Sequence, residues 1–152
     1  MRRSRPSSVA ATAASETQRE SRRIVELYDV HRYLAWFLVL TNAGVGVWAL
    51  VAHSVPVLRV RPLWWAVAVA QLSAFAIAIV GVVMLDRYGL ELDQFHALYG
   101  FSCIVAVGIL YSYRGSPFVK DKVYLLYGFG SLFIMGLGIR AMYLGTHSPF
   151  AR

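Results

Sequence analysis

Four long apolar runs constrain the fold of this chain more than any other feature of its sequence. They cover residues 33–52, 63–85, 95–113 and 123–144. Each is close to the roughly 20 residues that an α-helix needs to cross a hydrocarbon core of about 30 Å. The runs do not alternate polar and apolar residues, which excludes a membrane β-barrel. We therefore predict an all-α, polytopic membrane protein with four spanning helices.

The links between these runs are short. Short links make successive helices antiparallel neighbours. Aromatic residues gather near the ends of the runs, as expected where amphipathic rings meet lipid head groups; they include Tyr33, Trp36, Trp48, Trp64, Tyr113, Tyr124 and Tyr143. The sequence predicts an antiparallel four-helix transmembrane bundle over residues 24–152.

The N-terminal segment differs from the rest of the chain. Charged residues make up 15% of the sequence, against about a quarter in soluble domains, and many lie in this segment. Residues 1–23 are basic, rich in Ser, Ala and Thr, and have no apolar period, which predicts a disordered tail. From Ile24 the spacing of Ile24, Leu27 and His31 places all three on one helical face. This predicts a short amphipathic lead-in at the membrane interface.

The net charge of +7 fits membrane orientation and anionic lipid, since the positive charge lies in the tail and beside apolar runs. It does not form a basic face on a folded surface, so we expect no nucleic-acid partner. A basic tail ahead of the first helix predicts a cytoplasmic N-terminus. An even number of spans then places the C-terminus in the cytoplasm too. We expect a multi-pass protein of the cell inner (plasma) membrane.

Small residues indicate how the helices pack, because close backbone approach drives helix association in lipid. The second run has a ridge of alanines at four-residue spacing, namely Ala66, Ala70, Ala74 and Ala78. The third and fourth runs share the pattern Asp-x4-Leu-Tyr-Gly-Phe-x6-Gly, starting at Asp93 and Asp121. Its glycines are Gly100 and Gly108 in one run and Gly128 and Gly136 in the other. We expect the two runs to approach closely there. The alternative is that these small-residue faces contact a second copy of the chain.

A polar cluster is predicted at one membrane face. Antiparallel packing brings Asp93 and His96, at the start of the third run, beside Arg140, near the end of the fourth. Polar groups in a span are functional candidates because they cost free energy to insert. We expect an Asp93–Arg140 ion pair with His96 alongside. The alternative is that Arg140 extends to the head groups and His96 lies in the interface.

Two histidines form a candidate site for b-type haem. Such a site takes two imidazoles at one level on facing helices, and a four-helix bundle can hold a cofactor in its core. His31 and His96 both lie near the inner face, whereas His53 lies across the membrane. Two points count against haem: His31 precedes the first apolar run, and no histidine lies deep in a run.

No motif of a hydrolase, a metalloprotease or a nucleotide-binding enzyme is present. We therefore predict a non-catalytic integral membrane protein without a cofactor, an accessory or assembly subunit or a helix-packing oligomer. Its partners would be the lipid bilayer and other membrane subunits or itself. The first alternative is a membrane subunit that binds haem b through His31 and His96. The second is a small transporter, which needs polar residues at the midplane; the spans offer few, such as Asn42 and Gln71.

Overall fold

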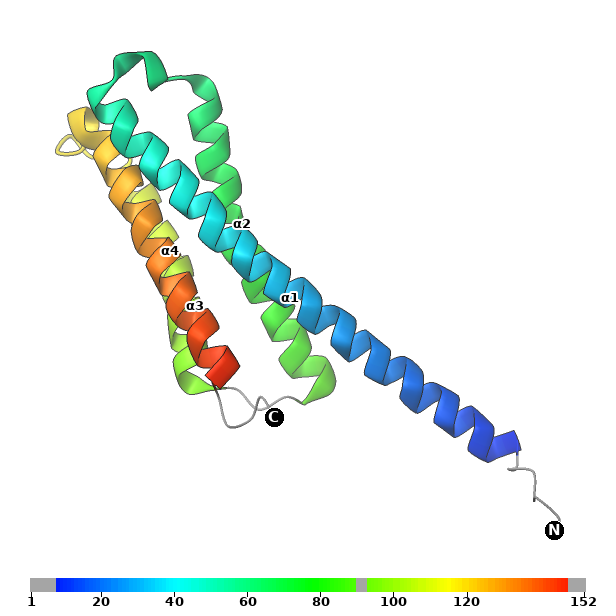
Figure 1. Ribbon diagram of the computed structural model, residues 1–152. Helices are drawn as coiled ribbons and strands as arrows, with labels where there is room; N and C mark the ends of the chain where they lie inside the picture. The colour runs from blue at the N-terminus through cyan, green and yellow to red at the C-terminus, as the bar shows by residue number, and fades with distance from the viewer. Residues whose placement is uncertain (1–7, 90–92, 148–152) are drawn as a thin grey trace, which may run out of the picture.

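The computed structural model describes residues 8–89 and 93–147. All its regular elements are helices (Figure 1). The four α-helices are α1 (Ser8–Ser54), α2 (Arg61–Tyr88), α3 (Gln94–Tyr113) and α4 (Val123–His147), and the short 3-10 helices η1 (Pro56–Leu58) and η2 (Lys120–Lys122) precede α2 and α4. All four α-helices are long and apolar enough to cross a membrane, which confirms the predicted number of long apolar helices.

The long helix α1 is the centre of the packing. It packs along both α4 and α2, and α3 packs mainly on α4. Figure 1 shows the chain turning back at each link, while the N-terminal part of α1 projects beyond the other helices. We call the end from which it projects the proximal end, and the end with η1 and η2 the distal end. The proximal end contains the start of α3 and the ends of α2 and α4.

Local signals in the sequence explain where two of the helices begin and end. Pro62 lies in the first turn of α2, where a missing backbone N–H costs nothing. The same helix ends at Gly89, which has a φ of 57° and donates its N–H to the Leu85 carbonyl, a left-handed cap that favours glycine. The side chain of Asp93 caps α3 by accepting a 2.8 Å hydrogen bond from the His96 N–H.

Glycines mark the close contacts of α4 with its neighbours. A Cβ on Gly128 would lie 2.6 Å from Leu50 Cδ2 and 3.1 Å from the Leu50 nitrogen, so α1 and α4 nearly touch there. A Cβ on Gly130 would overlap the side chain of Leu110 in α3. Tyr127 and Ile134, on the same helix, are buried in the core. The packing of α4 therefore depends on the small size of these two glycines.

The predicted glycine contact between α3 and α4 is different in the structure. A Cβ on Gly100, Gly108 or Gly136 would meet nothing within 4 Å. Gly128 is the one of the four that contacts a neighbouring helix, and that helix is α1. The repeated pattern failed as a guide because it fixes spacing along each helix and not the rotation of each helix about its axis.

The alanine ridge of α2 faces α1. Ala70 and Ala74 are buried, while Ala66 and Ala78 are half-buried. The Asn42 side chain of α1 donates a 3.0 Å hydrogen bond to the carbonyl of Ala70. The ridge thus lies at a contact within the chain, because small side chains let the polar group of one helix reach the backbone of the next.

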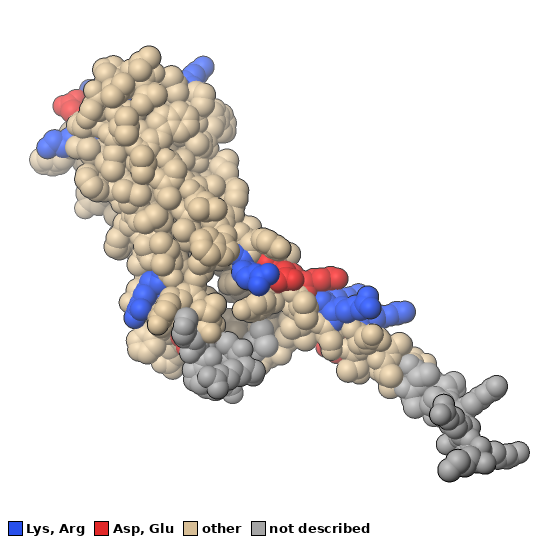
Figure 2. Space-filling view, viewed as in Figure 1, with Lys and Arg blue, Asp and Glu red and all other residues tan. Residues whose placement is uncertain are grey.

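The outer surface between the two ends of the molecule is apolar. Figure 2 shows charged side chains at the ends and along the N-terminal part of α1, with almost none between. Large apolar side chains are exposed in this zone, including Trp65, Ile79, Val82, Phe101, Phe129 and Phe133. An exposed apolar area this extensive is unfavourable in water and fits contact with lipid.

The N-terminal segment differs from its prediction. Residues 1–7 of the predicted disordered tail lie outside the described residues. Residues 8–23 are helical and form the first part of α1. Three hydroxyls there, on Ser15, Thr17 and Ser21, donate to carbonyls of the preceding turn. Ala, Glu and Arg favour helix, and extending an existing helix avoids the cost of a new nucleus. Low hydrophobicity alone therefore predicted the wrong local structure.

Candidate functional site

The structure brings His31 and His96 together at the proximal end. Their ring centroids are 5.9 Å apart, and the ring planes are inclined by 50°. His31 comes from α1 and His96 from the first turn of α3. These are the two histidines that the sequence placed at one face, and His53 lies at the distal end of α1. The site is therefore a pair of imidazoles contributed by two separate helices.

Hydrogen bonds at both the backbone and the ring hold His96 in place. Its backbone N–H donates a hydrogen bond to the Asp93 carboxylate, as described above. Its Nδ1 lies 2.9 Å from the carbonyl oxygen of Ala141 in α4. A carbonyl oxygen only accepts hydrogen bonds, so Nδ1 carries the proton. In the neutral ring Nε2 is then the nitrogen with the free lone pair.

Glycines from the other two helices adjoin the imidazoles. A Cβ on Gly81 of α2 would lie 3.4 Å from His31 Cε1. A Cβ on Gly145 of α4 would lie 2.9 Å from His96 Nδ1. His31 is half-buried, and its Nδ1 is buried without a hydrogen-bond partner among the described residues. All four helices thus meet at the histidine pair, and two of them contribute only backbone.

No ion pair between Asp93 and Arg140 is found among the described residues, where an ion pair of 3.0 Å joins Arg32 to Asp29. Asp93 instead caps α3, since the free N–H groups at a helix start favour a carboxylate. The guanidinium of Arg140 lies 5.8 Å from the ring centroids of both Tyr99 and Tyr143. Arg140 is exposed, so stacking on aromatic faces takes the place of the ion pair.

Polar residues near the middle of the spans are buried in the bundle. Asn42, Gln71 and Ser131 are almost fully buried. Asn42 binds the carbonyls of Leu38 and Ala70. Both amide atoms of Gln71 and the Ser131 hydroxyl have no partner within the described residues. Ordered water is the usual partner of such groups.

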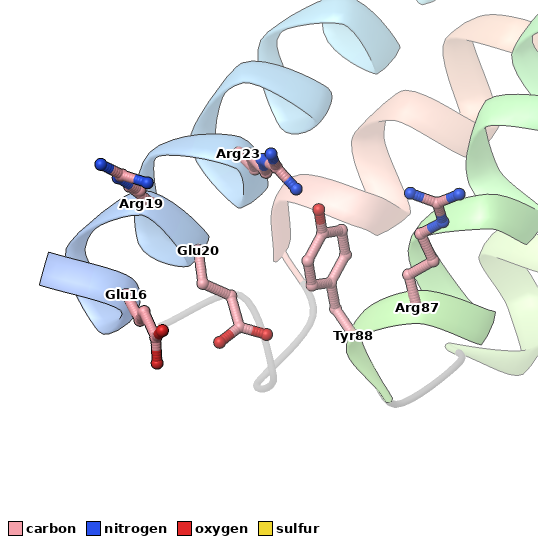
Figure 3. Close-up of a pocket in the computed structure, with 6 residues that line it drawn as sticks. All are labelled: Glu16, Arg19, Glu20, Arg23, Arg87 and Tyr88. Carbon is pink, nitrogen blue, oxygen red and sulfur yellow. The ribbon is translucent and has the colours of Figure 1, made fainter. Parts of the chain in front are cut away.

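A charged pocket of about 380 Å³ lies at the proximal end (Figure 3). Its lining comes from the N-terminal part of α1 and the end of α2, and consists of Glu16, Arg19, Glu20, Arg23, Arg87 and Tyr88. Sequence reasoning missed this pocket because it took residues 1–23 as disordered. The alternating acidic and basic residues of that segment were the available signal for a charged helix.

Within residues 8–89 and 93–147, no group of three or more His, Cys, Asp or Glu side chains is placed to hold a metal ion. The histidine pair is thus a set of two donors. No protein family, curated protein or solved structure was found to match this chain.

Proposed function

We propose that this chain is a haem-binding membrane subunit that carries electrons, with His31 and His96 as the two axial ligands of a b-type haem. The helices would form an antiparallel transmembrane bundle in the cell inner (plasma) membrane. The observation that carries the proposal is the 5.9 Å separation of the two imidazole centroids. The sequence alone favoured a subunit without a cofactor, and the proximity of the two rings is the reason for preferring haem.

The separation of the rings suits a metal between them. Two metal–nitrogen bonds of about 2 Å each, with the distance from each nitrogen to its ring centre, span roughly 6 Å. Zinc sites take three or four protein ligands, whereas the porphyrin supplies the equatorial nitrogens of haem. Two imidazoles are therefore a sufficient protein donor set for haem and a small one for zinc.

The surroundings of the pair support the same function. The bond from His96 Nδ1 to the Ala141 carbonyl is the kind of second contact that orients a ligating histidine and makes its other nitrogen more basic. Gly81 and Gly145 let the backbones of α2 and α4 pack against the rings and fix their positions. Haem here would supply one-electron redox chemistry, and this chain's residues would bind it, orient it and tune its potential.

The position of the pair suggests the role of the subunit. It lies at the proximal end, which the basic N-terminal segment would orient toward the cytoplasm. A haem near one face can exchange electrons with a partner on that side. The chain would then act as an accessory subunit of a membrane redox complex, with catalysis in another subunit.

The test is haem binding by the purified chain and two histidine variants. The protein is expressed with a haem precursor, extracted in mild detergent and examined by absorption spectroscopy in its oxidised and reduced forms. We expect a haem spectrum for the wild type and for His53→Ala, and its loss in His96→Ala. A wild type without haem, or a His96→Ala variant that keeps a full complement, would overturn the proposal.

A further inference from the structure

We propose that His96 is the permanent axial ligand of the haem and that His31 gives way, in the reduced protein, to a small neutral ligand of the carbon monoxide class. The inference rests on the proposed haem site and names a second ligand for it. It follows from a difference between the two imidazoles, because a hydrogen bond to another helix supports the ring of His96 and none to a described residue is made by Nδ1 of His31.

Both rings turn the edge that carries Nδ1 toward the backbone of another helix. A Cβ on Gly81 of α2 would lie 3.4 Å from His31 Cε1 and 3.9 Å from its Nδ1. A Cβ on Gly145 of α4 would lie 2.9 Å from His96 Nδ1 and 3.2 Å from its Cε1. In each ring Nε2 is therefore the nitrogen left to bind iron, and Nδ1 is the nitrogen that a second contact can support.

The two rings differ in that second contact. His96 Nδ1 donates to the Ala141 carbonyl at 2.9 Å, whereas His31 Nδ1 is buried without a hydrogen-bond partner in the described part of the chain. Such a bond makes the other ring nitrogen a stronger ligand, and its loss typically weakens metal binding about 10–100-fold. His31 is therefore the weaker of the two ligands.

Release of His31 from the iron also costs less than release of His96. A His96 ring that swung away would break its hydrogen bond to Ala141. With Nε2 on the iron, Nδ1 of His31 carries a proton, and a buried N–H without a partner is unfavourable. His31 is half-buried at the proximal end, where α1 projects beyond the other helices (Figure 1). A His31 ring that swung outward would bring this N–H to water.

The class of ligand follows from the surroundings of the pair. The exchange transfers no electron and no proton, since His31 Nε2 leaves with its lone pair and the incoming ligand donates a lone pair in its place. An anion would lose its water on entry without gaining a hydrogen-bond donor, because His96 uses its Nδ1 proton on Ala141. A neutral diatomic ligand such as carbon monoxide meets no such cost. The reduced chain would therefore bind a diatomic ligand at the position of His31, in addition to carrying electrons.

The first experiment measures carbon monoxide binding by the reduced, haem-loaded chain in detergent, using absorption spectroscopy. We expect the wild type to bind carbon monoxide, and His31→Ala to bind it at least about tenfold more tightly because no internal ligand competes. His53→Ala, at the distal end, is the control and should bind as the wild type does. A haem-bearing wild type that binds no carbon monoxide would overturn the inference.

Resonance Raman spectroscopy identifies which histidine stays on the iron. Flash photolysis removes the carbon monoxide and leaves one iron–histidine bond, whose stretching band depends on the hydrogen bond at Nδ1 of that histidine. We expect the same band from the photolysed wild type and from reduced His31→Ala, because His96 is the ligand in both. A different band in the wild type would show that His96 is the histidine replaced.

Gly81 offers a matched pair of variants that act on Nδ1 of His31. A Cβ there makes an ordinary van der Waals contact with the ring, so Gly81→Ala should keep the fold. In Gly81→Ser the hydroxyl can accept the Nδ1 proton while it donates to a carbonyl of its own helix. We expect Gly81→Ser to bind carbon monoxide about tenfold more weakly than Gly81→Ala, because His31 becomes the stronger ligand. Equal affinities in the two variants would contradict the inference.

The two proposals fail in different ways. A wild type without haem in its absorption spectrum overturns the haem site and this inference with it. A wild type that holds haem and keeps both histidines on the iron under carbon monoxide overturns only the exchange of His31.

Discussion

His31 of α1 and His96 of α3 lie with their ring centroids 5.9 Å apart at the end of the molecule from which α1 projects. Each of the remaining two helices presents a glycine to this pair. The glycine at position 145 is needed for this arrangement, because a Cβ there would lie 2.9 Å from His96 Nδ1.

Gly145 tests whether space beside His96 matters. A Cβ there would lie 2.9 Å from His96 Nδ1, so Gly145→Val should displace the ring and break its bond to Ala141. We expect the haem-to-protein ratio, measured by pyridine haemochrome assay, to fall severalfold. Gly136→Val is the matched control on the same helix, since a Cβ at Gly136 meets nothing within 4 Å. Equal haem content in the two variants would contradict the geometry of the site.

Gly128 tests the contact of α1 with α4. A Cβ there would lie 2.6 Å from the Leu50 side chain and 3.1 Å from its backbone nitrogen, and the backbone cannot move away easily. Gly128→Ala should therefore destabilise the fold by about 1–3 kcal/mol. Thermal unfolding in detergent, followed by circular dichroism, measures the effect. Gly44→Ala, at an open position, should leave the melting temperature unchanged or raise it; equal losses would argue against the contact.

Asn42 tests the contact of α1 with α2. Its side-chain amide donates to the carbonyl of Ala70 across the helix interface. Asn42→Leu should lower stability by about 0.6 kcal/mol, the average for such bonds between membrane helices, and by no more than about 1.7 kcal/mol. The Thr41 hydroxyl bonds only within α1, to the carbonyls of Phe37 and Leu38, so Thr41→Val should have a smaller effect. The reverse order of stabilities would refute the assignment.

Asp93 tests the link between the start of α3 and the histidine. Its carboxylate caps the helix at the His96 N–H, so Asp93→Ala should cost about 1 kcal/mol. Asp93→Asn keeps an accepting oxygen and should retain most of that stability. Chemical denaturation of the detergent-solubilised protein compares the two. If both variants unfold like the wild type, the cap contributes little to the position of His96.

The sequence was sufficient for the number of long helices and for the approximate bounds of α2, α3 and α4, because a span needs only length and hydrophobicity. It missed the start of α1, which begins at Ser8. It placed His31 and His96 at one face, since depth follows from position along each helix. It could not show that the rings face each other, because helix rotation depends on packing at many residues. The same limit explains Gly108 and Gly136, which the repeat assigned to a contact and the structure leaves open.

The pocket of Arg23 and Arg87 could not be predicted for a different reason. It needs residues 8–23 to be helical, and their composition alone suggested disorder. The pairing of Asp93 with Arg140 failed because each found a closer partner, a helix start for the carboxylate and aromatic rings for the guanidinium.

The most direct test of the account is the spin state of haem bound to the oxidised protein, measured by electron paramagnetic resonance. Two imidazole ligands predict a six-coordinate, low-spin signal in the wild type. His31→Ala should convert it to a high-spin signal, and added imidazole should restore the low-spin form. A wild-type signal that is high-spin, or a low-spin signal that His31→Ala and His96→Ala both leave unchanged, would contradict the assignment of these two histidines as the haem ligands.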